Sequence, residues 1–230
     1  MQYSLKQIFN YVKIKDVLHF FLACFVFPFA IVAKIFVRKF YLICEDRNEA
    51  RDNGYRFFKW IRENEPKIKV AYAIDKRSPD REKVKSIGKV INFGGIAHWF
   101  WYVVADKNIS SQKDGKPNAA VCYFFEVVLK LRKNNRVFLQ HGVIKDALDW
   151  LYYKNTYMRY FVAGAKPEYD FIEETFGYPK GHIIYTGLAR FDSLHNVKSD
   201  KGLILVMPTW REWLGRESRE NKNTVFTDTP

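Results

Sequence analysis

The chain has 230 residues, 48% of them hydrophobic and 17% aromatic, which excludes a disordered protein and allows one large domain or two small ones. Its formal net charge of +13 favours a polyanionic partner: nucleic acid, an anionic membrane surface or a phosphate-bearing substrate. Three widely spaced cysteines (Cys24, Cys44 and Cys122) form no CxxC or Cys/His cluster, so we expect reduced structural thiols in a cytosolic protein and no zinc site.

Residues 1–39 predict a segment that associates with a membrane. Apolar residues recur at helical spacing before residue 13, and residues 17–33 are almost wholly apolar. This apolar run is close to the lower length limit for a spanning helix, about 17 residues, and Pro28 predicts a kink. Lysines and arginines flank the run on both sides, which suits an anionic cytoplasmic leaflet. An interfacial or re-entrant anchor is therefore favoured over a single span, a signal peptide or a core helix.

From residue 40 onward, short β-branched or aromatic runs alternate with helical patterns. The runs predict strands at 40–45, 68–75, 89–94, 136–140, 160–165, 182–187 and 202–208. The patterns between them predict helices at 49–64, 80–87 and 166–177, a core helix around 98–102 and a flexible loop at 110–118. Strands that alternate with helices imply βαβ units, so the expected fold class is α/β with a mostly parallel sheet.

In open parallel sheets, ligands bind outside the carboxyl ends of the strands. Polar candidates follow three of the predicted strands: His141 and Gly142 after 136–140, Arg190 and Asp192 after 182–187, and Thr209 and Arg211 after 202–208. Guanidinium groups match phosphate oxygens in a bidentate manner, so this edge of the sheet suits a phosphorylated ligand.

His141 is the first candidate for a general base, because imidazole titrates near neutral pH and can deprotonate a hydroxyl that attacks phosphorus. Gly142 would let the backbone approach the ligand closely. The alternative for His141 is a turn histidine bonded to a carbonyl. For Arg190 and Arg211 the alternative is an ordinary surface charge, and Asp192 either orients Arg190 or caps a short helix.

Several common signatures are missing from the sequence. It contains no GxxxxGK[ST] loop, GxGxxG, GxSxG or HExxH, which argues against P-loop and serine hydrolase chemistry. The aromatic residues lie in apolar runs and do not alternate with basic residues, so a nucleic acid is not an expected partner.

Six blocks, in order along residues 41–212, resemble the CDP-glycerol glycerophosphotransferase family, the teichoic acid and capsule polymerases and primases of bacteria. The blocks are LICEDRNEARDNGYRFFKWIREN, AIDKRSPDREKVKSIGKVINFGG, AHWFWYVVADKNIS, VFLQHGVIKD, FGYPKGHIIYTGLARFDSL and ILVMPTWR. The resemblance implies a two-domain GT-B fold and work as a peripheral protein at the cytoplasmic face of the cell membrane. It also implies transfer of a polyol phosphate from a CDP-activated donor to a lipid-linked glycan or polyol-phosphate acceptor, in teichoic acid or capsular polysaccharide synthesis.

The resemblance also implies roles for particular residues. The histidine of the family's HG block matches His141, which would be the base for the acceptor hydroxyl, with CMP as the leaving group. The TGLARFD and PTWR blocks raise the expectation that the arginines and Asp192 belong to the site, and Thr209 lies in the second of these blocks. The EARDNG block suggests a place on the acceptor side for Arg51, Asp52 and Asn53, whose alternative is an exposed helix start.

The implied domain organisation is a membrane-associating segment at 1–39, an acceptor-side Rossmann-like domain at 40–201, and the start of a donor domain with a polar tail at 202–230. Most of the CDP-binding domain is therefore expected to be missing, or supplied by a partner chain. No cofactor is predicted beyond CDP-glycerol or another CDP-polyol as donor substrate, and the need for a divalent cation stays open. The alternative is a non-catalytic fragment that docks on a membrane or on a partner transferase.

Overall fold

The structure, a computed structural model, describes residues 12–113, 115–195, 197–198 and 202–206. The chain divides into two compact units, Met1–His195 and Asn196–Pro230. In the second unit, residues 203–206 have no regular secondary structure. The strand predicted at 202–208 is therefore not formed by its described residues, because their backbone pairs with none of the described strands.

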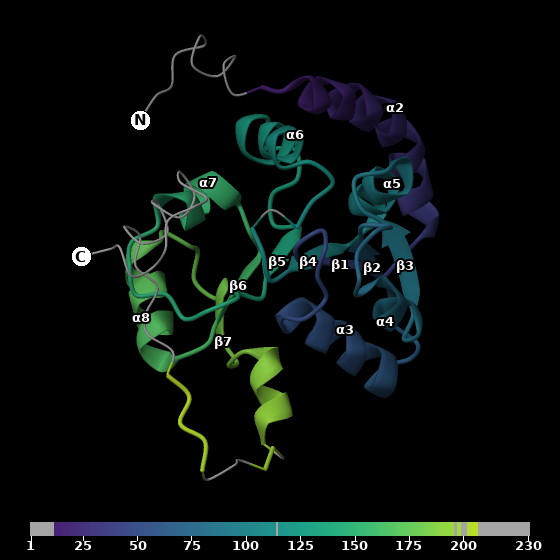
Figure 1. Cartoon of the computed structure of the whole chain (residues 1–230). Helices are drawn as coiled ribbons and strands as arrows, with labels where there is room; N and C mark the ends of the chain where they lie inside the picture. Colours follow the sequence, from purple (N-terminus) through teal and green to yellow (C-terminus); the bar gives the residue numbers. More distant parts are fainter. Residues whose placement is uncertain (1–11, 114, 196, 199–201, 207–230) are drawn as a thin grey trace, which may run out of the picture. The chain divides into compact units, whose positions relative to one another are not determined.

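A seven-stranded sheet forms the centre of the first unit (Figure 1), and its strand order is β3-β2-β1-β4-β5-β6-β7. All neighbouring strands are parallel. The strands are β1 (Phe40–Cys44), β2 (Lys69–Ile74), β3 (Lys89–Asn92), β4 (Lys107–Ser110), β5 (Arg136–Phe138), β6 (Tyr160–Ala163) and β7 (Ile183–Tyr185). The predicted α/β class with a parallel sheet is confirmed.

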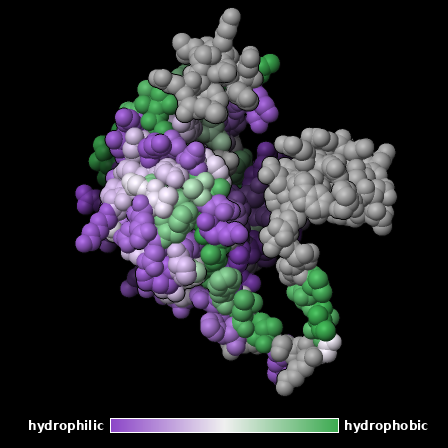
Figure 2. All heavy atoms as spheres, turned by 90° about the vertical axis from the view of Figure 1, so that its left-hand side faces the viewer, coloured by the Kyte–Doolittle hydropathy of each residue, from purple (hydrophilic) through white to green (hydrophobic). Residues whose placement is uncertain are grey.

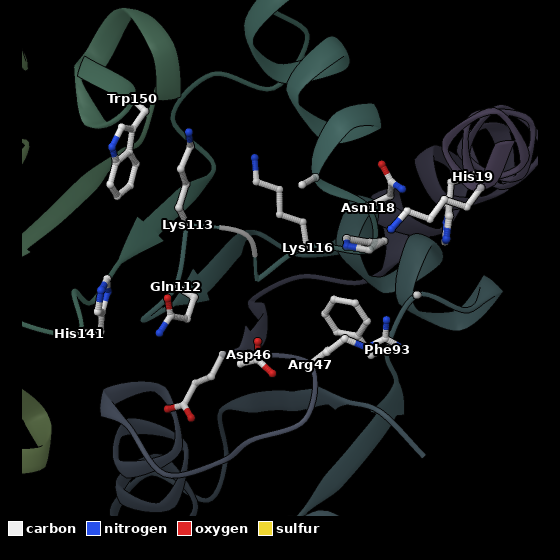
Figure 3. Close-up of a pocket in the computed structure, with 15 residues that line it drawn as sticks. His19, Asp46, Arg47, Phe93, Gln112, Lys113, Lys116, Asn118, His141 and Trp150 are labelled. Atoms are coloured by element: carbon white, nitrogen blue, oxygen red, sulfur yellow. The ribbon is translucent and has the colours of Figure 1, made fainter. Parts of the chain in front are cut away.

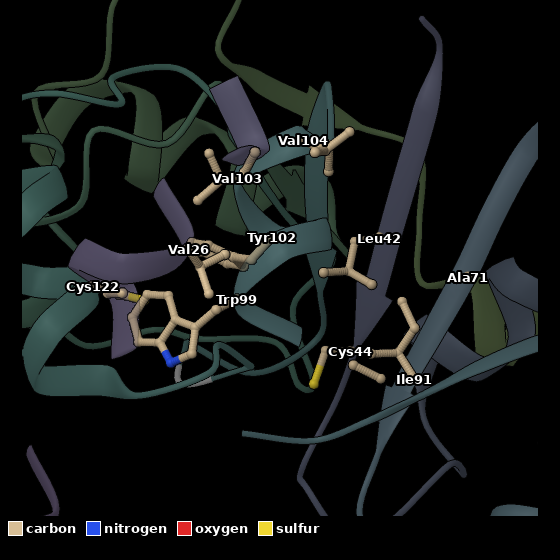
Figure 4. Packing of buried hydrophobic residues seen from close by; sticks show 14 of the residues in the cluster. Val26, Leu42, Cys44, Ala71, Ile91, Trp99, Tyr102, Val103, Val104 and Cys122 are labelled. Atoms are coloured by element: carbon tan, nitrogen blue, oxygen red, sulfur yellow. The ribbon is translucent and has the colours of Figure 1, made fainter. Parts of the chain in front are cut away.

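Helices cover both faces of the sheet (Figure 1). They are α2 (Ile14–Phe36), α3 (Asn53–Asn64), α4 (Arg81–Lys85), α5 (Ile96–Val104), α6 (Ala119–Tyr123), α7 (Tyr153–Thr156) and α8 (Lys166–Thr175), with shorter turns η1 (Phe124–Val128), η2 (Asp149–Leu151) and η3 (Ala189–Leu194). Side chains alternate along β1: Leu42 packs with α2, α5 and α6, whereas Ile43 packs with α3 and α4. Figure 4 shows the first of these clusters, in which Val26 of α2 lies against Trp99 and Tyr102 of α5.

One strand, β4, was not predicted. Its sequence, KNIS, has neither apolar alternation nor a continuous apolar run. It is nevertheless an interior strand, because it pairs with β1 on one side and with β5 on the other. The buried amide nitrogen of Asn108 donates to the carbonyl of Tyr102 (3.0 Å) and to the side chain of Asn135. Tertiary hydrogen bonds thus engage the amide nitrogen of a polar residue that local propensity would place in a loop, whereas its buried Oδ1 has no hydrogen-bond partner among the described residues.

The apolar N-terminal helix α2 is long and apolar enough to cross a membrane, judged by length and composition. It runs through Pro28 without interruption and packs on α5 through Ala23, Val26 and Ala30. Its other side exposes a row of large apolar residues: Leu18, Phe21, Phe25, Phe29, Val32, Ile35 and Phe36. The face of the molecule in Figure 2, by contrast, is mostly hydrophilic, with apolar residues in small groups.

Candidate functional site

The direction in which strands are added changes between β1 and β4, which is where ligands bind in folds of this topology. From β1 the sheet continues to β2 and β3, and from β4 it continues to β5, β6 and β7. A pocket of about 860 Å³ lies at the carboxyl ends of these central strands. Figure 3 shows that its lining residues come from the ends of several strands, from the loop after β4 and from α2.

Four cationic side chains line the pocket: Lys15, Arg47, Lys113 and Lys116. Lys116 is buried and forms an ion pair with the buried Glu126, with Nζ 3.1 Å from Oε2. Arg47 pairs with Asp75, and its guanidinium lies 5.5 Å from the centre of the Phe93 ring. Two carboxylates, Glu45 and Asp46, also line the pocket, so cations outnumber anions on its wall.

Glu45 follows β1 directly and is buried at the start of α3. Its carboxylate accepts backbone N–H groups from Arg51 (3.0 Å), Asp52 (3.2 Å) and Tyr55 (2.6 Å). Burial raises the pKa of this carboxyl, and the three N–H donors oppose the rise. A Cβ at Gly54 would lie 2.8 Å from Cγ of Glu45, so this glycine permits the close approach. Glu45 therefore caps α3 from outside, and the helix begins at Asn53 instead of residue 49.

His141 is an exposed residue on the wall of the pocket, at the bend that follows β5. Its Nδ1 lies 3.2 Å from the backbone carbonyl oxygen of Ser111, at the end of β4. Because a carbonyl can only accept, Nδ1 carries the hydrogen and Nε2 keeps its lone pair. In Figure 3 the ring stands at one end of the pocket, opposite the end at which His19 lies. This tautomer is the one that a general base requires.

The bend that presents His141 is held from several sides. Gln140 is fully buried with a positive φ of 63°, and its side-chain oxygen accepts the backbone N–H of His141 (3.0 Å). The buried carboxylate of Glu168 accepts the N–H groups of Ile144 (2.8 Å) and Gly164 (2.6 Å), and lies 3.5 Å from Nε2 of Gln140. A left-handed glutamine is costly, so these hydrogen bonds stabilise the bend.

The other predicted site residues that the structure describes do not line the pocket. Arg51 pairs with Asp80 (2.7 Å). Arg190 pairs with Asp52 (2.8 Å), although 138 positions separate the two in the sequence. Buried Asn53 accepts the backbone N–H of Arg190 (2.9 Å) and donates to the carbonyl of Gln140 (2.6 Å). The structure thus brings Asp52, Asn53 and Arg190 together, and Asn53 joins them to the bend before His141, so that α3, η3 and the segment after β5 are connected.

For the remaining candidate residues, the described part of the chain shows no contact that supports a role in the site. Gly142 follows His141, and a Cβ there would meet no atom of the described residues within 4 Å, so no close approach by this part of the chain requires a glycine. Asp192 is exposed on η3. Thr209 and Arg211 lie outside the described residues.

Sequence reasoning missed most of the cationic wall of the pocket. Lys113 and Lys116 belong to the segment 110–118, which was expected to be a flexible loop, yet Ser110, Ser111, Lys116 and Asn118 in it are buried. The available signal was that these lysines follow a strand, but β4 was not recognised. Lys15 and His19 come from α2, which was assigned to a separate membrane segment and not to the site.

Two histidines stabilise the far side of the pocket. His98 is fully buried, its Nδ1 accepts the N–H of Gly94 (3.0 Å), and burial lowers its pKa to about 3. His19 accepts the indole N–H of Trp99 at Nδ1 (3.0 Å), and burial lowers its pKa as well. Because Nδ1 of each ring accepts an N–H, the ring hydrogen lies on Nε2 in both histidines. Among the described residues, no group of three His, Cys, Asp or Glu side chains could hold a metal ion.

A Rossmann-like parallel sheet with a cationic, histidine-bearing pocket at its switch point defines a domain suited to phosphorylated ligands. Comparison with known families identifies it further. The chain belongs to the CDP-Glycerol:Poly(glycerophosphate) glycerophosphotransferase family, whose model matches residues 29–226. The resemblance inferred from the six sequence blocks is confirmed.

Individual relatives agree with this assignment. The minor teichoic acid biosynthesis protein GgaB of Bacillus subtilis (strain 168) is 32% identical over 187 residues, which are 79% of this chain and 20% of GgaB. Solved structures of the wall teichoic acid polymerase TagF share the fold: one has a TM-score of 0.54 at 14% identity over 78% of this chain, and a variant has 0.56 at 12% over 85%. The chain spans about half of each TagF chain, 50% in both cases.

Proposed function

We propose that this chain carries the acceptor-binding half of a transferase that moves glycerol phosphate, or another polyol phosphate, from a CDP-activated donor to an acceptor hydroxyl. The observation that carries the proposal is His141, which stands at a cationic switch-point pocket with Nδ1 directed at the carbonyl of Ser111. Family membership supplies the class of reaction. The acceptor is a polyol-phosphate chain or a lipid-linked glycan of teichoic acid or capsular polysaccharide synthesis.

In the proposed mechanism, Nε2 of His141 removes the proton from the acceptor hydroxyl. The oxygen attacks the β-phosphorus of the CDP-polyol, a new P–O bond forms, and the bond to the CMP oxygen breaks with CMP as the leaving group. Phosphoryl transfer depends mainly on positioning and charge stabilisation, which Arg47, Lys113 and Lys116 are placed to supply. A second domain, on the same or on another polypeptide, holds the CMP moiety.

The place of action that we propose is the cytoplasmic face of the cell membrane. Helix α2 exposes large apolar side chains, Lys15 lies in its first turn, and Lys34 lies in its last turn. Basic residues that flank an apolar helix favour an anionic leaflet. In this arrangement α2 lies in the membrane surface while its packing on α5 keeps the pocket near the lipid.

The test is CMP release from CDP-glycerol by the full-length protein, in the presence of a polyol-phosphate acceptor. We expect His141→Ala to lower the rate about 10²–10⁴-fold, the usual contribution of a general base. His195→Ala is the matched control, because His195 is exposed after η3 and lies outside the pocket. A His141→Ala variant with the control's rate would refute the role of His141. No CMP release from any CDP-polyol, even when the second domain is supplied, would refute the reaction.

A further inference from the structure

The peptide unit between Gln140 and His141 is held at both of its polar ends. Its carbonyl oxygen accepts a side-chain N–H of Asn53, whose Nδ2 lies 2.6 Å away. Its N–H donates to the side-chain oxygen of Gln140 (3.0 Å). Because a peptide unit is planar, its orientation fixes the direction in which the next residue leaves the backbone. The two hydrogen bonds therefore set the direction in which His141 points.

Asn53 contacts the backbone of the bend and does not line the pocket. It is fully buried at the start of α3. Its Oδ1 accepts the backbone N–H of Arg190 (2.9 Å), so its Nδ2 must face the Gln140 carbonyl. Both polar atoms of the side-chain amide are thus engaged within the protein. Any influence of Asn53 on the pocket is therefore exerted through the bend.

The backbone that this hydrogen bond holds is in a costly conformation. Gln140 has a positive φ of 63°, which is uncommon for a residue other than glycine and persists only where the surroundings enforce it. Without the Asn53 bond, Gln140 is free to leave this region, and the peptide unit after it turns. The His141 ring would then lose its 3.2 Å contact with the Ser111 carbonyl, which keeps the ring hydrogen on Nδ1.

The same asparagine joins the bend to η3, the last helix that the structure describes in the first unit. In η3, Arg190 donates its backbone N–H to Asn53 and its guanidinium to Asp52 (2.8 Å). Asp52 and Asn53 are consecutive at the start of α3. The position of η3 and the orientation of the peptide unit before His141 are therefore coupled through one side chain.

We propose that Asn53 is a positioning residue for the general base: its amide orients the peptide unit before His141 and makes that orientation depend on η3. This inference rests on the proposed function, in which His141 is the base. It assigns to Asn53 and Arg190 an action on the base, whereas the sequence blocks placed both among the residues that bind substrate.

The experiment compares Asn53→Leu with Asn64→Leu in the full-length protein, with the second domain supplied. Asn64 is the exposed last residue of α3, and its Nδ2 also donates to a backbone carbonyl, that of Trp60 (2.9 Å). We expect Asn53→Leu to lower kcat for CMP release about 10–100-fold, because a small displacement of a catalytic group is costly. The KM for the CDP-polyol should stay within about twofold, since the second domain holds the CMP moiety. The nitrogen shifts of the His141 ring, measured without substrate, should change in Asn53→Leu and not in Asn64→Leu.

Asn53→Asp tests the hydrogen bond itself, and it carries the test if Asn53→Leu does not fold. A protonated carboxyl donates to the Gln140 carbonyl as the amide does, whereas a carboxylate repels it. We expect the kcat of Asn53→Asp, relative to that of the wild type at the same pH, to rise as the pH is lowered. A ratio that does not change with pH would overturn the role of this hydrogen bond.

Arg190→Ala tests the connection to η3. It removes the ion pair with Asp52, so the ring shifts of His141 should change even without substrate, when no phosphate contact is involved. Arg51→Ala is the matched control, because it removes the ion pair between Arg51 and Asp80 and should leave the ring shifts unchanged. Equal ring shifts in the two variants would overturn the connection to η3.

These outcomes separate the inference from the proposed function. The ring shifts require no turnover, so a wild type that releases no CMP refutes the reaction while the shifts still decide the role of Asn53. If the wild type releases CMP, equal kcat and equal ring shifts in Asn53→Leu and Asn64→Leu refute the role of Asn53 alone. An Asn53→Leu protein that is less stable but whose folded fraction keeps the wild-type kcat and ring shifts refutes it as well.

Discussion

Replacing Glu168 with glutamine keeps the shape of the side chain but changes what it offers to the His141 bend. The carboxylate accepts two backbone N–H groups, from Ile144 and Gly164, and Glu168 is only 3% exposed. A glutamine has a single acceptor oxygen, so one N–H would face an amide donor. An unpaired buried N–H costs about 1–3 kcal/mol. The left-handed backbone of Gln140, worth about 1–3 kcal/mol of strain, would also lose part of its support.

We therefore expect Glu168→Gln to lower the free energy of unfolding by about 1–3 kcal/mol, measured by urea denaturation with circular dichroism. Glu174→Gln on the same helix is the control, since Glu174 is exposed and a surface change costs at most about 0.5 kcal/mol. The nitrogen shifts of the His141 ring should change in Glu168→Gln and not in the control. Equal stability of the two variants, or an unchanged ring spectrum in a destabilised Glu168→Gln, would refute the view that Glu168 positions His141.

Two further predictions concern buried charge. Lys116→Met leaves the Glu126 carboxylate buried without its ion-pair partner, so it should lower the free energy of unfolding by about 3–5 kcal/mol. The double variant Lys116→Met, Glu126→Leu should recover much of this loss, because no buried charge is left unpaired. Urea denaturation measures both values. Burial lowers the pKa of His98 to about 3 in the folded protein. Below about pH 6.5 the unfolded chain therefore binds a proton at this histidine that the folded chain does not bind. The free energy of unfolding should then fall by about 1.4 kcal/mol per pH unit. His98→Gln, which keeps an acceptor for the N–H of Gly94, should remove this slope between pH 6.5 and 5. If the free energy of unfolding depends on pH with the same slope in the wild type and in His98→Gln, buried neutral His98 is not the cause of the slope.

The parallel α/β class could be predicted because it depends on local patterns. Short β-branched or aromatic runs separated by amphipathic helices identify strands whose sequences carry their own burial signal, as in β1 and β2. The position of His141 at the end of β5 followed from the same reasoning, since the carboxyl end of a parallel strand is known once the strand is known. The family blocks added the class of reaction.

The sequence alone thus determined the alternation of strands and helices, the apolar N-terminal helix and the histidine at a strand end. Tertiary structure decided the strand order, the inclusion of β4 and the composition of the pocket. The polar strand β4 is stabilised by hydrogen bonds to residues outside it. Arg190 forms an ion pair with Asp52, which is 138 positions earlier in the sequence. Lys15 and His19 reach the pocket only because α2 packs on α5. Such contacts join residues far apart in the chain, so no local pattern encodes them.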